Sequence, residues 1–192
     1  MTYDRDFWEE RWSEVPPSRA TERPPNAHLR AEAEDLRPGR ALDAGCGHGS
    51  DALWLAARGW QVTGVDFSAT ALCHARAAAE AAGAEIEWIE GDLATWARPP
   101  GQFDLVVSLY VHVAGSVEAM VRRMAAGVAP GGTLLLVGHH PAGNQVQVSV
   151  EQAVAAPDPD RWELVVAEDR PRAAAGTGID AVIRARNDGA DD

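Results

Sequence analysis

The sequence predicts an α/β fold in which a mostly parallel sheet carries helices on both faces. Short apolar runs alternate with amphipathic helical patterns, as expected for repeated strand–helix–strand units. One run ends in Asp43 and passes through Gly45, Gly47 and Gly49 into a helical pattern that stops at Gly59. A strand, a tight glycine turn and a helix in this order open a nucleotide-binding unit. We therefore expect a Rossmann-like sheet of seven strands.

Length and composition fit one globular domain. The chain has 192 residues, 46% of them hydrophobic, which is enough for a single substantial core. We predict one domain over residues 1–186, with 1–36 as an N-terminal helical cap. Residues 187–192 are polar, contain glycine and carry three acids, so we expect a disordered tail.

The composition also indicates the cellular compartment and the binding partners that we expect for the protein. No apolar run approaches a membrane span, no signal peptide opens the chain, and Cys46 and Cys73 fit no metal or disulfide framework. We expect a cytoplasmic monomer or homodimer with no membrane partner. The formal net charge is −12 and the arginines are scattered, whereas nucleic-acid-binding proteins usually show a basic stripe. We expect no nucleic-acid partner.

The first 36 residues predict a helix, a loop and a second helix. Large side chains recur at helical spacing over residues 3–12, and acids lie on the other side. A loop with four prolines follows over residues 13–25, and we expect it to be mobile without a ligand. A helix over residues 27–36 then leads to the first strand, with a break at Pro38 and Gly39.

The remaining elements follow from periodicity and caps. We predict strands at 61–65, 85–89, 104–109 and 133–137, with the strand at 85–89 nearer the sheet edge and the strand at 104–109 central. Ser68 caps a helix that ends at Gly83 and packs Ala71, Leu72, Ala75, Ala78, Ala79 and Ala82 on the sheet, and Ser116 caps the next helix. A short helix is expected over residues 149–156. The alternation of valines with polar residues around its start makes a strand the alternative. Strands at 162–167 and 179–185 form an antiparallel hairpin at one edge.

The glycine loop is not built for phosphate. The dinucleotide fingerprint needs Gly or Ala where Ser50 stands, and no Gly-Lys-Ser/Thr follows the glycines. No lysine or arginine lies between Asp43 and Trp54. The loop therefore fits an uncharged or cationic nucleoside ligand. Asp66 ends the second strand, where a carboxylate can accept from both ribose hydroxyls; the alternative is a helix cap or loop charge.

The motifs resemble those of a known family. Residues 42–49 read Leu-Asp-Ala-Gly-Cys-Gly-His-Gly and resemble the first motif of the class I S-adenosylmethionine-dependent methyltransferases. Four further segments follow in that family's order: Val-Asp-Phe-Ser at 65–68, Gly-Asp-Leu at 91–93, Phe-Asp-Leu-Val-Val at 103–107 and Ala-Pro-Gly-Gly-Thr-Leu-Leu-Leu at 129–136. The resemblance implies S-adenosyl-L-methionine as cofactor, S-adenosyl-L-homocysteine as product and a small-molecule acceptor.

The resemblance also implies a donor site. In the family, the turn at Gly91-Asp92-Leu93 holds adenine through the acid and the next backbone amide. The N-terminal cap, with Trp8 and Trp12, looks like that of thiopurine and tellurite-type methyltransferases, where two tryptophans close over the cofactor; the alternative is plain packing. The implied cofactor-binding residues are Trp8, Trp12, Asp43, Gly45, Cys46, Gly47, Asp66, Phe67, Asp92, Leu93 and Ser108. His48 is expected to face outward or to touch the methionine end.

The acceptor pocket should follow the fourth and fifth strands. A sulfonium donor is already activated, so the protein mainly aligns the acceptor, excludes water and removes a proton where the nucleophile is a hydroxyl. His112, His139 and His140 are candidate bases, although each histidine alone can instead satisfy backbone groups or face solvent. Tyr110, His112, His139 and Arg19 are candidate pocket residues. Arg19 stands where the thiopurine branch has other residues, and it is placed to meet a carboxylate.

Two other functions compete with methyl transfer. A nicotinamide-dependent oxidoreductase is disfavoured by Ser50 and by the absence of lysine, which excludes a Tyr-x-x-x-Lys pair. A module that binds S-adenosylmethionine without catalysis stays open, since a donor site can persist when an acceptor pocket is lost. We expect no metal, because no acidic residue adjoins His139 and His140 in the sequence.

Overall fold

The computed structural model describes residues 4–16, 22–96, 99–112, 116–139, 161–172 and 178–189. Arg19, His140 and the helix predicted over 149–156 lie outside the described residues.

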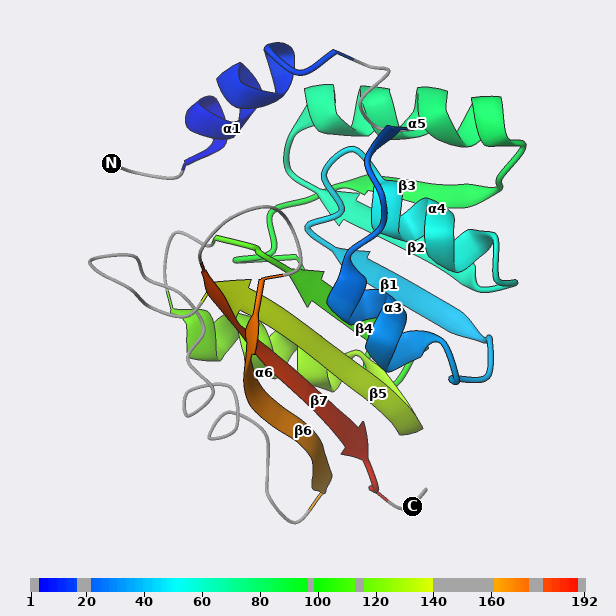
Figure 1. Cartoon of the computed structure of the whole chain (residues 1–192), viewed down its shortest axis with the longest axis vertical. Helices are drawn as coiled ribbons and strands as arrows, with labels where there is room; N and C mark the ends of the chain where they lie inside the picture. The colour runs from blue at the N-terminus through cyan, green and yellow to red at the C-terminus, as the bar shows by residue number, and fades with distance from the viewer. Residues whose placement is uncertain are drawn as a thin grey trace.

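A seven-stranded sheet forms the centre of the protein, in the order β3-β2-β1-β4-β5-β7-β6 (Figure 1). Strands β1 to β5 pair in parallel, whereas β7 runs antiparallel to both β5 and β6. This confirms the predicted Rossmann-like class, the edge position of the third strand and the antiparallel pair. The strands are β1 (Arg40–Ala44), β2 (Gln61–Asp66), β3 (Ile86–Glu90), β4 (Phe103–Leu109), β5 (Val128–His139), β6 (Trp162–Pro171) and β7 (Ile179–Asn187).

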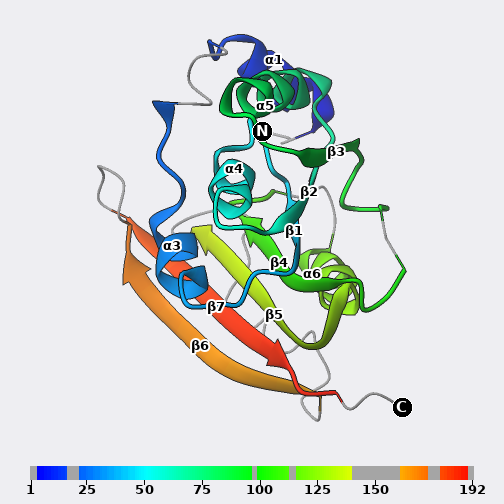
Figure 2. The same cartoon turned by 90° about the vertical axis from the view of Figure 1, so that its right-hand side faces the viewer.

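Helices cover both faces of the sheet. Figure 2 shows α6 on one side and α3 and α4 on the other. Helix α1 lies beside α5 at the end of the molecule where the parallel strands finish, in both views. The helices are α1 (Arg5–Ser13), α3 (Ala27–Ala33), α4 (Ser50–Ala56), α5 (Ala69–Ala82) and α6 (Val117–Ala126). None of the described helices is both long and apolar enough to cross a membrane.

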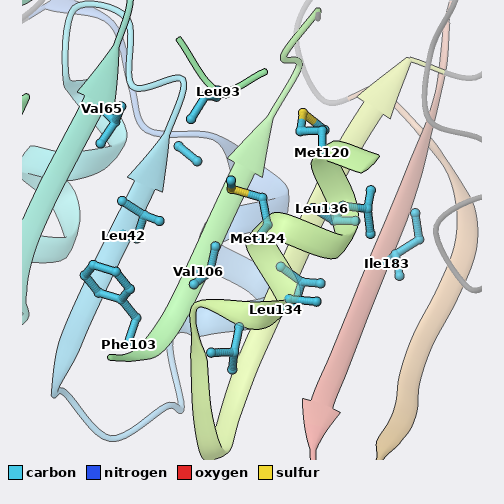
Figure 3. Close-up of a cluster of buried hydrophobic side chains, with 14 of the residues drawn as sticks. Leu42, Val65, Leu93, Phe103, Val106, Met120, Met124, Leu134, Leu136 and Ile183 are labelled. Carbon is cyan, nitrogen blue, oxygen red and sulfur yellow. The ribbon is translucent and has the colours of Figure 1, made fainter. Parts of the chain in front are cut away.

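Two hydrophobic cores explain the continuous apolar runs in the central strands. On β4, Val106 faces α6 and packs with Met120 and Met124 (Figure 3). Its neighbours Leu105 and Val107 face the other core, with residues of α3 and α4. Successive side chains of a strand point to opposite faces, so a strand buried on both faces is apolar throughout. This arrangement fixes the carboxyl ends of β1, β2, β4 and β5 along one edge.

Some predicted boundaries were wrong. Strand β5 begins at Val128 rather than at 133, with a pairing irregularity opposite Phe103 and Leu105 that takes up the Pro-Gly-Gly run. Strands β6 and β7 extend past their predicted ends, and α3 ends at Ala33. The side chain of Ala82 is exposed, because α5 reaches its last turn beyond the sheet.

The predicted tail also begins too early. Asn187 ends β7, is only 2% exposed, and donates its side-chain amide to the carbonyls of Val128 at 3.1 Å and Ala129 at 3.3 Å. A polar residue that the sequence assigns to a disordered tail therefore donates hydrogen bonds to two carbonyl groups at the irregular start of β5. Residues 190–192 lie outside the described residues.

We predict that Asn187→Ala lowers the free energy of unfolding by about 1–3 kcal/mol, because a buried carbonyl loses its donor. Urea unfolding measures the change. Asp188→Ala is the control, since this exposed carboxylate pairs only with Arg186 at the surface, and a shift within about 0.5 kcal/mol is expected. Equal losses in the two variants would contradict the role given to Asn187.

Candidate functional site

The glycine loop between β1 and α4 is held tightly against its surroundings. Gly45 and Gly47 have φ angles of 82° and 52°, in the left-handed region that favours glycine. The amides of Gly45 and Cys46 donate to the carbonyl of Val65 at 2.8 and 3.0 Å, which ties the loop to β2. A Cβ atom at Gly47 would lie 2.9 Å from the ring of Trp12. The loop therefore presents bare backbone at the edge where the strands end.

Asp66 fastens this loop to the next helix. Its carboxylate accepts from the amides of Gly47 and Ser68, both at 2.9 Å, and is almost fully buried. Burial raises the pKa of Asp66, although these hydrogen bonds oppose the shift. Asp66 thus has the loop and cap contacts that were the alternative to a ribose site. Each carboxylate oxygen accepts more than one hydrogen bond, so the ribose role stays a prediction compatible with these contacts.

Further acids lie beside the loop. Asp43 is 2% exposed, and its Oδ2 atom has no hydrogen-bond partner among the described residues. Burial, reinforced by the nearby charges of Asp51 and Asp66, raises the pKa of Asp43 well above its usual value. The sequence analysis missed Asp51, which accepts from the amide of Asn26 at 2.7 Å. A cationic group beside these carboxyls would be stabilised.

Two neighbours in the loop are neutral. His48 is buried, which excludes the outward-facing alternative and leaves the contact with the methionine end as a prediction, and its ring lies 5.1 Å from that of Trp12. Burial, with Arg23 and His74 nearby, lowers the pKa of His48 to about 4, so the ring is neutral near pH 7. The thiol of Cys46 is also buried, and burial raises its pKa, which makes it a poor nucleophile.

At the predicted adenine turn, the side chain of Asp92 is exposed and that of Leu93 is buried. Asp92 is exposed, and its carboxylate accepts from the amide of Ala94 at 2.8 Å. Leu93 packs its side chain into the core, so only its backbone is left to meet a ligand. Phe67 is half-buried under the guanidinium of Arg5, which lies 5.8 Å from its ring centre.

Helix α1 lies across all of these segments. Trp12 contacts the glycine loop, and the ring of Trp8 lies 5.8 Å from that of His112 after β4. The Glu9 carboxylate accepts from the amides of Ala69 at 2.7 Å and Thr70 at 3.4 Å, which are first-turn donors of α5. No residue of α1 is fully buried, so a few polar contacts and the two tryptophans hold this helix in place. Its closing over a ligand stays a prediction.

Three of the acceptor candidates and the predicted cofactor residue Ser108 meet at one small cavity. Ser108, Tyr110, His112 and His139 line it, together with Met120 and the end of β5. Its volume is about 10 Å³, which is the room that one water molecule needs. Burial and the nearby His139 lower the pKa of His112, so this ring is neutral near pH 7. An acceptor would need a wider cavity than the one observed.

Tyr110 has an unusual backbone at this cavity. Its φ angle is 56°, which a residue with a side chain rarely adopts. Its amide donates to the carbonyl of Val137 at 2.7 Å, and its ring stacks on His139 with centres 4.5 Å apart. Burial and the hydrogen bond to Asp180 raise the pKa of Tyr110, so the phenol stays protonated.

A cluster around Asp180 lies behind the cavity. The Asp180 carboxylate is fully buried and accepts from Tyr110 Oη at 2.7 Å and Arg172 Nε at 3.1 Å. It also lies 3.3 Å from His28 Nε2 and 3.2 Å from His139 Nδ1. We call these five residues the Asp180 cluster. Desolvation acts to raise the pKa of Asp180, but the hydrogen bonds from its partners outweigh it and hold that pKa below its usual value.

The sequence analysis missed this cluster, apart from Tyr110 and His139. It found no acidic residue beside His139 in the sequence, whereas the antiparallel β7 places Asp180 directly opposite it. Strand pairing across 41 positions leaves no local pattern to detect. In the described part of the chain, no three His, Cys, Asp or Glu side chains are placed to hold a metal together.

The chain resembles known methyltransferases. Residues 41–132 match the model of a family described as a methyltransferase domain. A trans-aconitate 2-methyltransferase of Paracidovorax citrulli is 34% identical over 129 residues, which are 58% of this chain and 48% of the relative. A ribosomal RNA small subunit methyltransferase C of Alcanivorax borkumensis is 39% identical over 72 residues, which are 38% of this chain and 22% of the relative.

A solved structure shares the fold. The magnesium protoporphyrin IX methyltransferase of Synechocystis PCC 6803 with bound S-adenosylhomocysteine has a TM-score of 0.68 at 18% identity, over 95% of this chain and 93% of that chain. The match to the methyltransferase domain model lies within the predicted domain and covers residues 41–132 of it. The chain spans about half the length of the first relative. None of these matches tests the likeness to the thiopurine and tellurite-type branch.

We predict that Glu9→Gln loosens α1, because the neutral amide is a weaker acceptor for the α5 amides. Hydrogen bonds from Thr70 and Ala69 outweigh desolvation and hold the pKa of Glu9 below its usual value. Docking should therefore be strongest above the unfolded pKa of about 4.3 and weaken as the pH falls through the lower folded value. Amide exchange over residues 5–13 should be faster in the variant at pH 7, with less change on acidification than in the wild type.

Glu10→Gln is the matched control, since Glu10 is an exposed carboxylate of the same helix. We expect wild-type exchange in this variant. If Glu10→Gln loosens α1 as much as Glu9→Gln, the contact with α5 does not hold the helix.

Proposed function

We propose that this protein is an S-adenosylmethionine-dependent methyltransferase that acts on a small-molecule acceptor. The observation that carries the proposal is the glycine loop in the segment that matches a methyltransferase domain, which lies against Trp12 and beside two buried carboxyls, Asp43 and Asp66. In parallel α/β sheets, ligands bind beyond the carboxyl ends of the strands, where this loop lies.

The residues present fit S-adenosylmethionine. When bound, this cofactor supplies a methyl group on a positively charged sulfur, and it also carries an ammonium group. The unpartnered Oδ2 atom of buried Asp43 suits such a cation, and the loop offers no basic side chain that would repel it. Asp66 would hold the ribose, and Asp92 with the amide of Leu93 would hold adenine. Gly45 and Gly47 carry no side chain, but Val111 and Trp12 fill the space beside them, so both side chains would have to move for a cofactor to reach the backbone.

The protein's own groups would align the acceptor and exclude water. Trp8 and Trp12 on α1 would cover the donor site. Ser108, Tyr110 and His139 would face the acceptor once the small cavity that they line had widened. His112 lies between Trp8 and this cavity and is neutral near pH 7, so it is the better placed base for an acceptor that must lose a proton. A thiolate acceptor would need no base.

Several observations favour a small molecule over RNA. The net charge is −12, which opposes binding to a phosphate backbone, although one relative is named for ribosomal RNA. Another relative is named for trans-aconitate, a small acid. Short connections between the core elements leave no separate substrate domain in the described part of the chain. The N-terminal tryptophans further support an acceptor of the thiopurine or tellurite kind, with sulfur, nitrogen and oxygen nucleophiles all open.

Two measurements test the proposal. Calorimetric titration should show that the protein binds S-adenosylmethionine and S-adenosylhomocysteine and does not bind NAD. Release of S-adenosylhomocysteine should then be detected with at least one member of a panel of small thiols, phenols and heteroaromatic amines. Binding without release from any acceptor would favour a non-catalytic module, and binding of NAD alone would favour an oxidoreductase.

We predict that Asp66→Asn weakens S-adenosylhomocysteine binding by about 1–3 kcal/mol, the scale for losing a charged hydrogen-bond partner. Titration calorimetry measures the change, and thermal unfolding reports the part due to loosening of the loop. Asp104→Asn is the control, because its carboxylate also accepts from a backbone amide, that of Arg40 at 2.7 Å, but at the opposite end of the sheet. Unchanged affinity in Asp66→Asn would rule out the ribose role.

A further inference from the structure

We propose that Asp180 is a positioning residue of the acceptor pocket, which holds Tyr110 and His139 in the geometry that methyl transfer needs. Its catalytic consequence rests on the proposed function, whereas the positioning rests on contacts alone.

The carboxylate of Asp180 joins four structural elements to β7. Its Oδ2 atom accepts from Tyr110 at the end of β4 and faces His28 of α3. Its Oδ1 atom accepts from Arg172 after β6 and faces His139 at the end of β5. Burying an ionised carboxylate is costly unless it is paired and hydrogen-bonded. Asp180 has no exposed surface and engages both oxygens, so these partners compensate its charge.

Strand register fixes where the carboxylate lies. Asp180 stands directly opposite His139 in the antiparallel pairing of β5 and β7. The guanidinium of Arg172 contacts both Asp180 and Nδ1 of His139. The Nδ1 side of the imidazole is therefore held by the Asp180 cluster, while the same ring lines the small cavity. Neither Asp180 nor Arg172 lines the cavity, so both act through His139 and Tyr110.

The backbone of Tyr110 extends the effect to the donor side. A left-handed conformation at a residue with a side chain is strained, and it persists only where the surroundings hold it. The bond to Asp180 and the stack on His139 supply that hold. The following residue, Val111, lies so close to Gly45 that a Cβ there would be 2.3 Å from it, and His112 reaches Trp8. Asp180 thus keeps the turn after β4 between donor loop and acceptor cavity.

Glu32 provides a matched comparison within the same region. It is also a buried carboxylate, 8% exposed, on α3, and it pairs with Arg170 at 2.6 Å and Arg184 at 3.6 Å on the β6–β7 hairpin. None of these three residues lines the cavity. Replacing either acid by its amide removes one buried negative charge, but only Asp180 holds pocket residues.

The experiment compares Asp180→Asn with Glu32→Gln in the full chain. The first readout is the NMR signal of the carbon-bound ring protons of His139, which the stacked ring of Tyr110 shifts. The second is S-adenosylhomocysteine affinity, and the third is kcat and KM with an acceptor that the wild type methylates. We expect Asp180→Asn to move the His139 signals and lower kcat at least tenfold, with affinity for S-adenosylhomocysteine within about threefold. Glu32→Gln should leave the signals and kcat within twofold of wild type.

Tyr110→Phe keeps the ring but removes its bond to Asp180, so it carries the test if Asp180→Asn does not fold. Tyr110→Phe should move the His139 signals in the same direction as Asp180→Asn does, and it should lower kcat by a smaller factor than Asp180→Asn. Unmoved His139 signals in the variant that folds, or equal losses of kcat in Asp180→Asn and Glu32→Gln, would overturn the proposal. If the wild type binds S-adenosylhomocysteine but methylates nothing, the proposed function fails, and the His139 signals still decide whether Asp180 positions the pocket.

Discussion

The hydrogen bonds of the Asp66 carboxylate to Gly47 and Ser68 hold the candidate site together. They join the glycine loop after β1 to the start of α5 after β2. Helix α1 then docks on that same start, because Glu9 accepts from the next two amides of α5. One buried acid and one surface acid therefore satisfy successive donors of a single helix N-terminus. The position of the N-terminal cap depends on this local geometry, since α1 buries no residue fully.

The fold around the proposed donor half could be predicted because its sequence signals are local. A strand, three glycines and a helix lie within seventeen residues, 40–56, and strand–helix alternation fixes where the strands end. Ser68 and Ser116 cap helices as predicted, each accepting from the amide three residues on. Periodicity identified β4 as central because its residues are buried on both faces. Each of these predictions used residues a few positions apart.

The contacts that could not be predicted join residues far apart in the chain. Glu9 meets α5 from 60 positions away, Arg5 meets Glu90 from 85, and His28 meets Asp180 from 152. None leaves a period or a spaced motif in the sequence. The early end predicted for β7 has a related cause, because the polarity of Asn187 is satisfied by carbonyls of β5, 58 and 59 positions away. The partners of such side chains can be predicted only once the order and pairing of the strands are known.

The two halves of the site are therefore built differently. The proposed donor half comes from the parallel part of the sheet, and the family match over residues 41–132 covers its loop and turns. The proposed acceptor half would depend on His139, Arg172 and Asp180, which lie beyond that match, and on His28, which lies before it. Likeness to known methyltransferases consequently supports the donor chemistry but carries little information about the acceptor. The proposed positioning of the acceptor pocket by Asp180 therefore rests on contacts that lie largely outside the matched segment.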